Sequence, residues 1–101
     1  MLNKLRTAIR GKYVCSLRYD DDTGNRRVEP HIVYESRNGK IMVDVYQTSG
    51  YSSTGKLPSW RPLIVDSIIS ITISSDQFAP RINEGYNPSN TKRYSKVICK
   101  V

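Results

Sequence analysis

The clearest alternation of apolar and polar positions runs from Arg26 to Gln47, on both sides of the dipeptide Asn38-Gly39. Asn-Gly accepts the positive φ angles of a two-residue turn, so this pattern predicts a β-hairpin with a fixed register. One face of the hairpin would then be apolar enough to line a core. That face pairs Ile32 with Val45, Tyr34 with Val43 and Ser36 with Ile41.

The opposite face of this hairpin mixes charged, aromatic and apolar side chains. It pairs His31 with Tyr46, Val33 with Asp44 and Glu35 with Met42. Polar groups interspersed with apolar ones are typical of a solvated outer face, and they are also found on the wall of a pocket. The pattern leaves both interpretations open.

An amphipathic helix is predicted for residues 2–10, because Leu2, Leu5 and Ile9 fall on one stripe. Asn3 is the expected N-cap and Gly11 the expected residue after the last turn. A helix this short is not stable alone, so it must dock on the rest of the chain.

Further strands are predicted on both sides of a long loop. Tyr13–Tyr19 alternates cleanly, and the acidic segment 20–25 after it is a turn without the ligand spacing of an EF-hand. The expected strands are 60–65, 68–74 and 96–101, the first two of which could form one bent strand, and the breaker-rich segments are 48–59 and 80–95. Phe78 is expected to close the end of the core.

A helix followed by five or six short strands predicts a mainly β protein, a small and strongly curled antiparallel β-barrel with a short N-terminal helix. The 101 residues suffice for one domain with a single core. We expect one domain over 1–101, with the helix in 1–11, the barrel in 13–78, and a C-terminal extension with a closing strand in 79–101.

Composition adds a formal charge of +7, from 16 Lys and Arg against 9 Asp and Glu. Such a balance favours polyanionic or phosphorylated partners, although a role in solubility explains it equally well. The cations gather near the two ends. They are Lys4, Arg6, Arg10 and Lys12 before the first acid, and Arg81, Lys92, Arg93, Lys96 and Lys100 beside Glu84.

Several function classes find no support in the sequence. No apolar stretch is long enough for a bilayer, and the N-terminus lacks the apolar run of a signal peptide, so we expect a cytoplasmic protein with Cys15 and Cys99 as free thiols. One His and two distant Cys give no zinc spacing, so neither a metal nor a cofactor is expected. The sequence has neither a nucleophile elbow nor a phosphate-binding glycine loop, so an enzyme is not expected.

A family resemblance adds a more specific expectation. The order Ala8-Ile9, Tyr13–Tyr19, an acidic turn with Gly24, Arg27-Val28-Glu29-Pro30-His31, Gly39-Lys40, Val45-Tyr46, Trp60-Arg61 and Phe78 resembles the WYL domain over residues 5–80. The resemblance implies an SH3-like or Sm-like barrel behind a short helix. It also implies a bacterial transcription regulator that senses a negatively charged or nucleic-acid ligand.

Three features depart from the family pattern. Ile41-Met42-Val43 stands where the name-giving tripeptide would fall, and Ser67 stands in place of the second arginine of the fourth strand. About a dozen residues precede the first strand, which leaves no room for the usual helix-turn-helix. The expectation is therefore a stand-alone domain, a fragment or a diverged relative.

Five residues are the expected ligand contacts: Arg27, His31, Tyr46, Trp60 and Arg61. Arg61 shares its strand parity with inward-facing positions and needs an anionic partner, either a ligand or Glu29 or Asp44. Trp60 would stack on a base or serve only in packing, and His31 would contact phosphate or be structural. Tyr19 and Tyr51 are weaker candidates for the same wall.

Three functions remain open at this point. The first is a ligand-binding or regulatory domain for a nucleotide or a short single-stranded nucleic acid. The second is an assembly module that docks a protein partner or self-associates through strand edges and basic ends. The third is a nucleic-acid binder driven by charge alone, which predicts a steep salt dependence.

Overall fold

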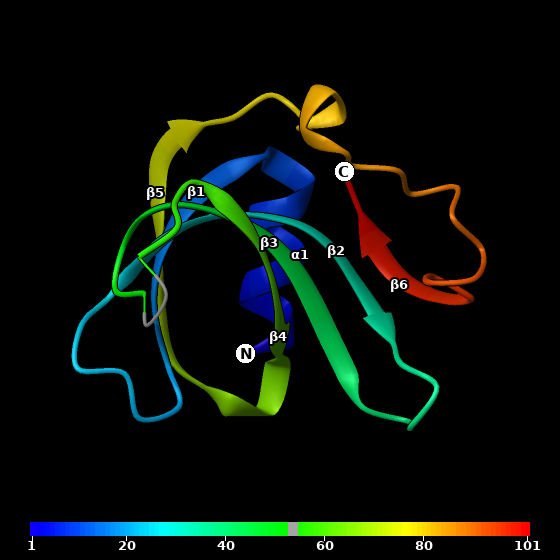
Figure 1. The fold of residues 1–101 in the computed structure, drawn as a ribbon, viewed down its shortest axis with the longest axis horizontal. Coiled ribbons are helices and arrows are strands. Elements are labelled where there is room, and N and C mark those ends of the chain that lie inside the picture. Colours follow the sequence, from blue (N-terminus) through cyan, green and yellow to red (C-terminus); the bar gives the residue numbers. More distant parts are fainter. Residues whose placement is uncertain (53–54) are drawn as a thin grey trace.

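The computed structural model describes residues 1–52 and 55–101, and it shows a mainly β chain with one short N-terminal helix (Figure 1). Two single 3₁₀ turns, η1 and η2, interrupt the second half of the chain. In chain order the elements are α1 (Leu2–Gly11), β1 (Tyr13–Tyr19), β2 (Arg26–Glu35), β3 (Ile41–Gly50), β4 (Ser59–Ile64), η1 (Val65–Ser67), β5 (Ile68–Gln77), η2 (Ile82–Glu84) and β6 (Lys96–Lys100).

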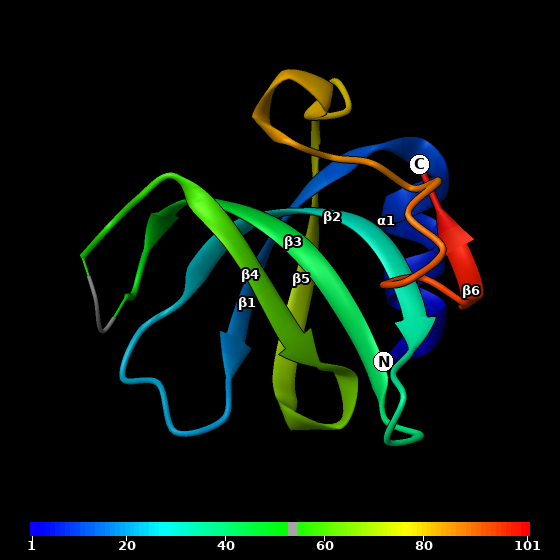
Figure 2. The same cartoon turned by 45° about the vertical axis from the view of Figure 1, so that its right-hand side comes forward.

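The strands form one antiparallel sheet in the order β4-β3-β2-β1-β5, with β6 added beside β2 (Figure 2). Strand β2 pairs with β3 along one edge, and on the other edge with β1 near Val28 and with β6 from Ile32 onward. Strands β4 and β5 are the two ends of this order, and no ladder joins them among the described residues. The mainly β prediction is confirmed, whereas closure into a barrel is not.

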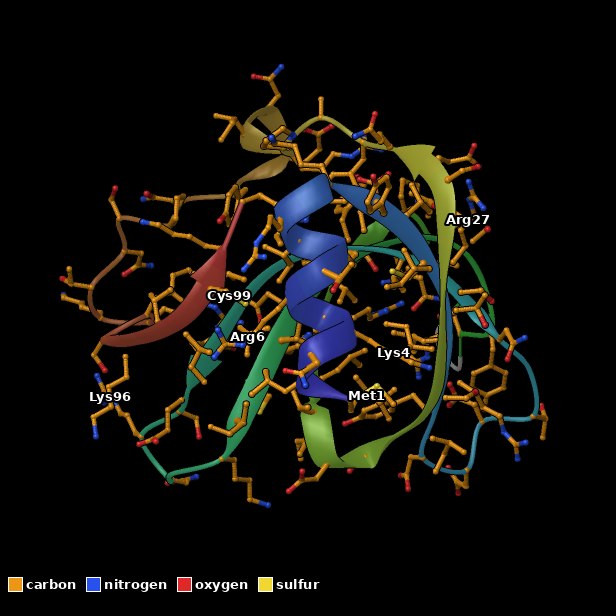
Figure 3. All side chains as sticks on the ribbon, turned by 180° about the vertical axis from the view of Figure 1, so that it is seen from behind. Met1, Lys4, Arg6, Arg27, Lys96 and Cys99 are labelled. Carbon is orange, nitrogen blue, oxygen red and sulfur yellow. The ribbon has the colours of Figure 1, made fainter. Side chains whose placement is uncertain are left out.

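The main core lies between α1 and the inner face of the sheet. Leu5 and Ile9 of α1 are buried there and Leu2 packs against them partly buried, which confirms the predicted helical stripe, and Ala8 is buried as well. Figure 3 shows α1 lying across the sheet when the molecule is seen from behind. The strands contribute Cys15, Leu17, Val28, Val33, Val43, Val45, Leu63, Ile68 and Ile71, and η1 contributes Val65.

The ends of α1 differ from the prediction. The helix begins at Leu2 after Met1, so Asn3 is not the N-cap, and Lys12 rather than Gly11 adopts the left-handed conformation at the other end. Gly11 instead leaves space for a neighbouring ring. A Cβ built there would come within 2.2 Å of the Tyr13 ring, so this glycine lets the ring lie against the last turn of the helix.

The predicted hairpin forms, but the predicted two-residue turn is wrong. The Gly39 amide donates to the Ser36 carbonyl at 2.9 Å, and Gly39 has a φ of 79°. This is a type I turn followed by a left-handed residue, which adds one residue to the loop and shifts the register by one. The observed pairs are Ile32 with Asp44, Val33 with Val43, Tyr34 with Met42 and Glu35 with Ile41.

A second shift occurs at a bulge in β2. Pro30 pairs with Val45 and Ile32 pairs with Asp44, so His31 is the extra residue of the bulge. The bulge places His31 and Ile32 on the same outer face, where both contact Tyr86. Because of the two shifts, Val33 joins the inner core, which the uniform alternation did not predict.

The outer face of β2, β3 and β4 is covered by the chain's own C-terminal segment, residues 79–95. His31 is fully buried, and Asp44 and Tyr46 are 4% and 8% exposed. The interpretation of this face as a solvated surface is therefore wrong. A smaller apolar cluster, consisting of Ile32, Tyr34 and Tyr86 with Met42, Trp60, Tyr94 and Val101 packed against it, fills the space between the sheet and this segment.

Candidate functional site

A cleft of about 200 Å³ lies between the outer face of the sheet and the C-terminal segment. Strands β3 and β4 supply one wall, and residues 85–94 supply the other. The residues that line this aromatic cleft are Asp44, Trp60, Gly85, Tyr86, Asn87, Asn90, Arg93 and Tyr94.

Asp44 forms the floor of the aromatic cleft and is fully hydrogen-bonded. Its carboxylate accepts the Tyr34 hydroxyl at 2.8 Å, two guanidinium N–H groups of Arg93 at 3.0 and 3.1 Å, and the Tyr94 hydroxyl. Burial, together with the Asp44 carboxylate, raises the pKa of Tyr94 to about 12, so this hydroxyl remains a donor at neutral pH. Asp44 therefore positions Arg93 and Tyr94 and has no free lone pair for a base or a metal ligand.

Aromatic rings form the inner wall of the aromatic cleft. Trp60 stacks with Tyr86 at 6.0 Å between ring centroids, and its edge meets Tyr46 at 5.2 Å. The indole N–H of Trp60 donates to the Glu84 carbonyl at 2.7 Å, so the ring is held from both sides. This wall offers apolar ring surface beside the polar floor.

His31 lies behind this wall and is held in its neutral form. The Arg81 backbone N–H donates to His31 Nε2 at 3.1 Å, so Nδ1 carries the proton that meets the Glu29 carbonyl at 2.8 Å. Burial lowers the pKa of His31, and the nearby Arg81 charge acts in the same direction. The side chain is inaccessible, which favours the structural interpretation of His31.

Arg81 fastens the start of the C-terminal segment to the sheet. It makes two hydrogen bonds to the buried Glu29 carboxylate, at 2.7 and 2.9 Å, and lies 4.7 Å from the centroid of the Tyr46 ring. Arg81 and Arg93 thus each bind one buried carboxylate of the outer face. Glu29 and Asp44, the two carboxylates expected to pair with Arg61, therefore pair with Arg81 and Arg93 instead.

The five predicted contacts do not converge on one site. His31, Tyr46 and Trp60 meet in one aromatic cluster. Arg27 is exposed near the start of β2 and forms an ion pair with Asp76 of β5 at 2.9 Å. Arg61 contacts the Ser52 hydroxyl at 3.0 Å and the Lys56 carbonyl at 3.3 Å, in the loop before β4.

The weaker candidates Tyr19 and Tyr51 also lie elsewhere. Their rings flank Arg26, at 5.3 and 5.9 Å from its guanidinium carbon. Arg26 also binds Asp22 at 2.7 Å and Gln47 at 3.3 Å. Arg26, which no sequence pattern singles out, therefore joins the acidic turn to the end of β3.

The residues that complete the aromatic cleft come from the breaker-rich segment. Its tyrosines and its local excess of cations were visible in the sequence, yet nothing there indicated that Arg93 and Tyr94 reach Asp44, which lies about fifty positions earlier. The two register shifts determine which outer-face groups are available, and neither shift follows from residue alternation.

Metal and disulfide chemistry find no built site in the described part of the chain. No group of three or more His, Cys, Asp or Glu residues there is arranged to hold a metal ion. Cys15 and Cys99 are free thiols, and burial raises the pKa of Cys15 to about 11. Among the described residues, no helix has the length and apolar character needed to cross a bilayer.

Comparison with known proteins gives no relative: no family model, curated protein or solved structure matches this chain.

Proposed function

We propose that this protein is a non-enzymatic binding domain whose aromatic cleft takes one base of a nucleotide or of a short single-stranded nucleic acid. The observation that supports this most directly is the composition of the cleft. Trp60, Tyr86 and Tyr94 supply ring surface, Asn87 and Asn90 supply amides, and the guanidinium of Arg93 lies beside them.

Each part of the aromatic cleft suits a base. Aromatic side chains stack on any base, and side-chain amides offer donors and acceptors to its edge. Arg93 remains 46% exposed while it neutralises Asp44, so the floor does not repel a phosphate attached to the base. A volume of about 200 Å³ limits the bound group to about the size of one ring system.

The charge of the whole chain supports the same class of ligand. A formal charge of +7 raises the local concentration of anionic ligands and their association rate. Charge alone gives no preference among them. On this proposal, the polar and aromatic groups of the cleft provide the selectivity, and the surrounding cations provide the attraction.

At the level of the fold, we propose a diverged WYL-like domain with an SH3-like or Sm-like barrel. The support is the connectivity: the two edge strands β4 and β5 follow each other through η1, which has three residues. A short link between the two edges of a sheet is what a small barrel requires. A cytoplasmic role in bacterial transcription regulation is part of the same proposal.

The test uses Trp60, the single tryptophan of the chain, as a reporter inside the cleft. A short oligonucleotide is titrated at low and near-physiological salt while the Trp60 emission is followed. We expect saturable quenching that persists at the higher salt. Asn90→Ala removes an amide from the cleft, together with the 3.4 Å hydrogen bond that its Oδ1 accepts from the Arg93 backbone N–H. It should weaken binding about fivefold, the effect of one lost hydrogen bond to the ligand.

The matched control is Asn83→Ala, which removes an exposed amide of η2 outside the aromatic cleft and should leave the affinity unchanged. Binding that disappears with salt and is equal in both variants would mean diffuse charge only. Arg61→Ala tests the alternative placement in the loop before β4. Loss of binding in this variant, with Asn90→Ala unaffected, would move the site there.

An assembly module remains the second candidate, because apolar side chains are exposed on the outer strands. Ile69 of β5 is 58% exposed and Val97 of β6 is 40% exposed. Exposed apolar groups on strands with a free edge favour pairing with another chain. Sedimentation at two concentrations distinguishes a self-associating module from a monomeric sensor.

A further inference from the structure

A second, separate hollow of about 150 Å³ lies between α1 and β6. Its rim carries three cations, Arg6 and Arg10 from α1 and Lys100 from β6, and its remaining lining consists of Ile9 and Cys99. In Figure 3, Arg6 lies on the side of α1 that faces β6 and Cys99, whereas Lys4 lies on the side toward β5. We call this feature the basic hollow.

The three cations of the basic hollow have no carboxylate partner among the described residues. The ion pairs of the described chain are formed by other cations, namely Arg26, Arg27, Arg81, Arg93 and Lys96. Two like charges four positions apart on a helix destabilise it, and here a third cation approaches from the neighbouring strand. An anion bound between the three cations would reduce this electrostatic repulsion.

Cys99 does not provide the missing negative charge. Burial raises the pKa of its thiol, although the charges of Arg6 and Arg10 oppose this effect. At neutral pH the thiol is therefore protonated, and the cations remain uncompensated. Cys99 instead marks the bottom of the hollow as a small, uncharged group.

The dipole of α1 stabilises a positive charge at only one of the three positions. Arg10 lies in the last turn of α1, where a cation is favoured by the negative end of the helix dipole. Arg6 is one turn earlier and Lys100 belongs to another element, so neither has this explanation. The helix end also offsets part of the attraction for an anion, so a site here needs several cations.

We propose that the basic hollow binds a phosphate-type anion, either a free phosphate or a phosphate of a nucleotide or nucleic-acid backbone. The guanidinium groups of Arg6 and Arg10 can each present two N–H donors to the oxygens of one phosphate, and Lys100 adds a compact charge. The lining by Ile9 and Cys99 is apolar, which strengthens each of these interactions relative to open solvent.

This site is distinct from the aromatic cleft. The residues that line the two features do not overlap, and the hollow contains no aromatic ring that could stack on a base. Its expected affinity for inorganic phosphate is modest, with a Kd of about 1–10 mM, because the cations are exposed and screened by salt.

The experiment is a titration of the full chain with inorganic phosphate at constant ionic strength, with chloride as the reference anion. Two readouts are taken: amide chemical shifts, and the rate at which Cys99 is alkylated. We expect saturable shifts at Arg6, Arg10 and Lys100, and slower alkylation of Cys99 as phosphate occupies the hollow. Cys15 is buried and serves as an internal control for unfolding.

Arg6→Gln is the test variant, and Lys4→Gln is its matched control on the opposite side of the same helix. We expect Arg6→Gln to weaken phosphate binding about fivefold to tenfold, and Lys4→Gln to leave it unchanged. Shifts spread evenly over all exposed cations, or equal affinity in the two variants, would overturn the proposal. So would alkylation of Cys99 that phosphate does not slow.

A second arm identifies the source of the phosphate. Protection of Cys99 from alkylation is compared between an oligonucleotide and inorganic phosphate, at equal total concentrations of phosphate groups. If the oligonucleotide protects at a far lower concentration, the ligand is a nucleic-acid backbone. If the two protect equally, the ligand is a free phosphate. The emission of Trp60 reports on the aromatic cleft alone. Failure of the cleft proposal is therefore seen independently of failure at the basic hollow.

Discussion

His31 shows how the surroundings of one side chain determine its protonation. Its two ring nitrogens are engaged in opposite senses, one accepting from the Arg81 backbone and the other donating to the Glu29 carbonyl. Protonation would turn Nε2 into a donor that faces another donor. Burial and this geometry therefore both favour the neutral imidazole.

The stability of the fold should depend on this histidine. Its folded-state pKa lies below the unfolded value near 6.5, so the unfolded chain binds more protons as the pH falls. The favourable contribution of neutral His31 is complete above about pH 6.5 and decreases as the pH falls through that value toward the folded pKa. We expect the melting temperature to decrease across this window, before the carboxylates titrate.

Because the chain has a single histidine, its imidazole resonances can be assigned directly. We expect them to show the neutral Nδ1–H form at neutral pH and to titrate with a pKa below the ordinary value. Titration at or above the ordinary pKa would contradict the hydrogen bonds described for His31.

At the scale of the secondary-structure elements, alternation predicted where the strands lie but not how they align. Asn38-Gly39 and the flanking apolar positions predict the β2–β3 hairpin. The alignment of the two strands depends on one additional residue in the turn and on His31 in the bulge. Each extra residue turns the side chains beyond it to the opposite face of the sheet. A period of two cannot detect an inserted residue, so it predicts the wrong face for Val33.

The turn can be tested with two glycines. Gly39 has a φ of 79° and open space around it, so Gly39→Ala strains only the backbone and should cost about 1 kcal/mol. Gly24 has no positive φ, and a Cβ there would make an ordinary 3.7 Å contact with Tyr51, so Gly24→Ala should be nearly neutral. Urea denaturation of both variants provides the comparison, and equal losses would argue against the left-handed residue in the turn.

At the scale of the whole molecule, the C-terminal segment is part of the fold and not an appendage to it. It brings Arg81 and Arg93 to two carboxylates buried on the outer face of the sheet. A buried carboxylate without a partner is costly, so these contacts hold the segment in place. The closing strand predicted at 96–101 forms as β6. The contacts of the segment before it could not be predicted, because each arginine and its carboxylate are about fifty positions apart and no local pattern connects them.

Two arginines with different surroundings test this view. Arg81→Met leaves the buried Glu29 without its partner and should lower the free energy of unfolding by about 2–3 kcal/mol. Arg27→Met breaks an exposed pair with Asp76 and should cost less than about 1 kcal/mol. Denaturation followed by Trp60 emission measures both, and similar losses would show that Arg81 does not anchor the segment.

Strand β2 has a further consequence for how this sequence can vary. Its ten residues pair with β3 along one edge, and with β1 and then β6 along the other. They also pack against α1 on the inner face and against the C-terminal segment on the outer face. Within it, Glu29 binds Arg81, Pro30 lies beside a bulge where a missing N–H is tolerated, and His31 fills the bulge. Substitutions in β2 must satisfy all these neighbours at once, so mutational drift should be slowest there and faster at exposed positions of the acidic turn before it, such as Asp21 and Thr23.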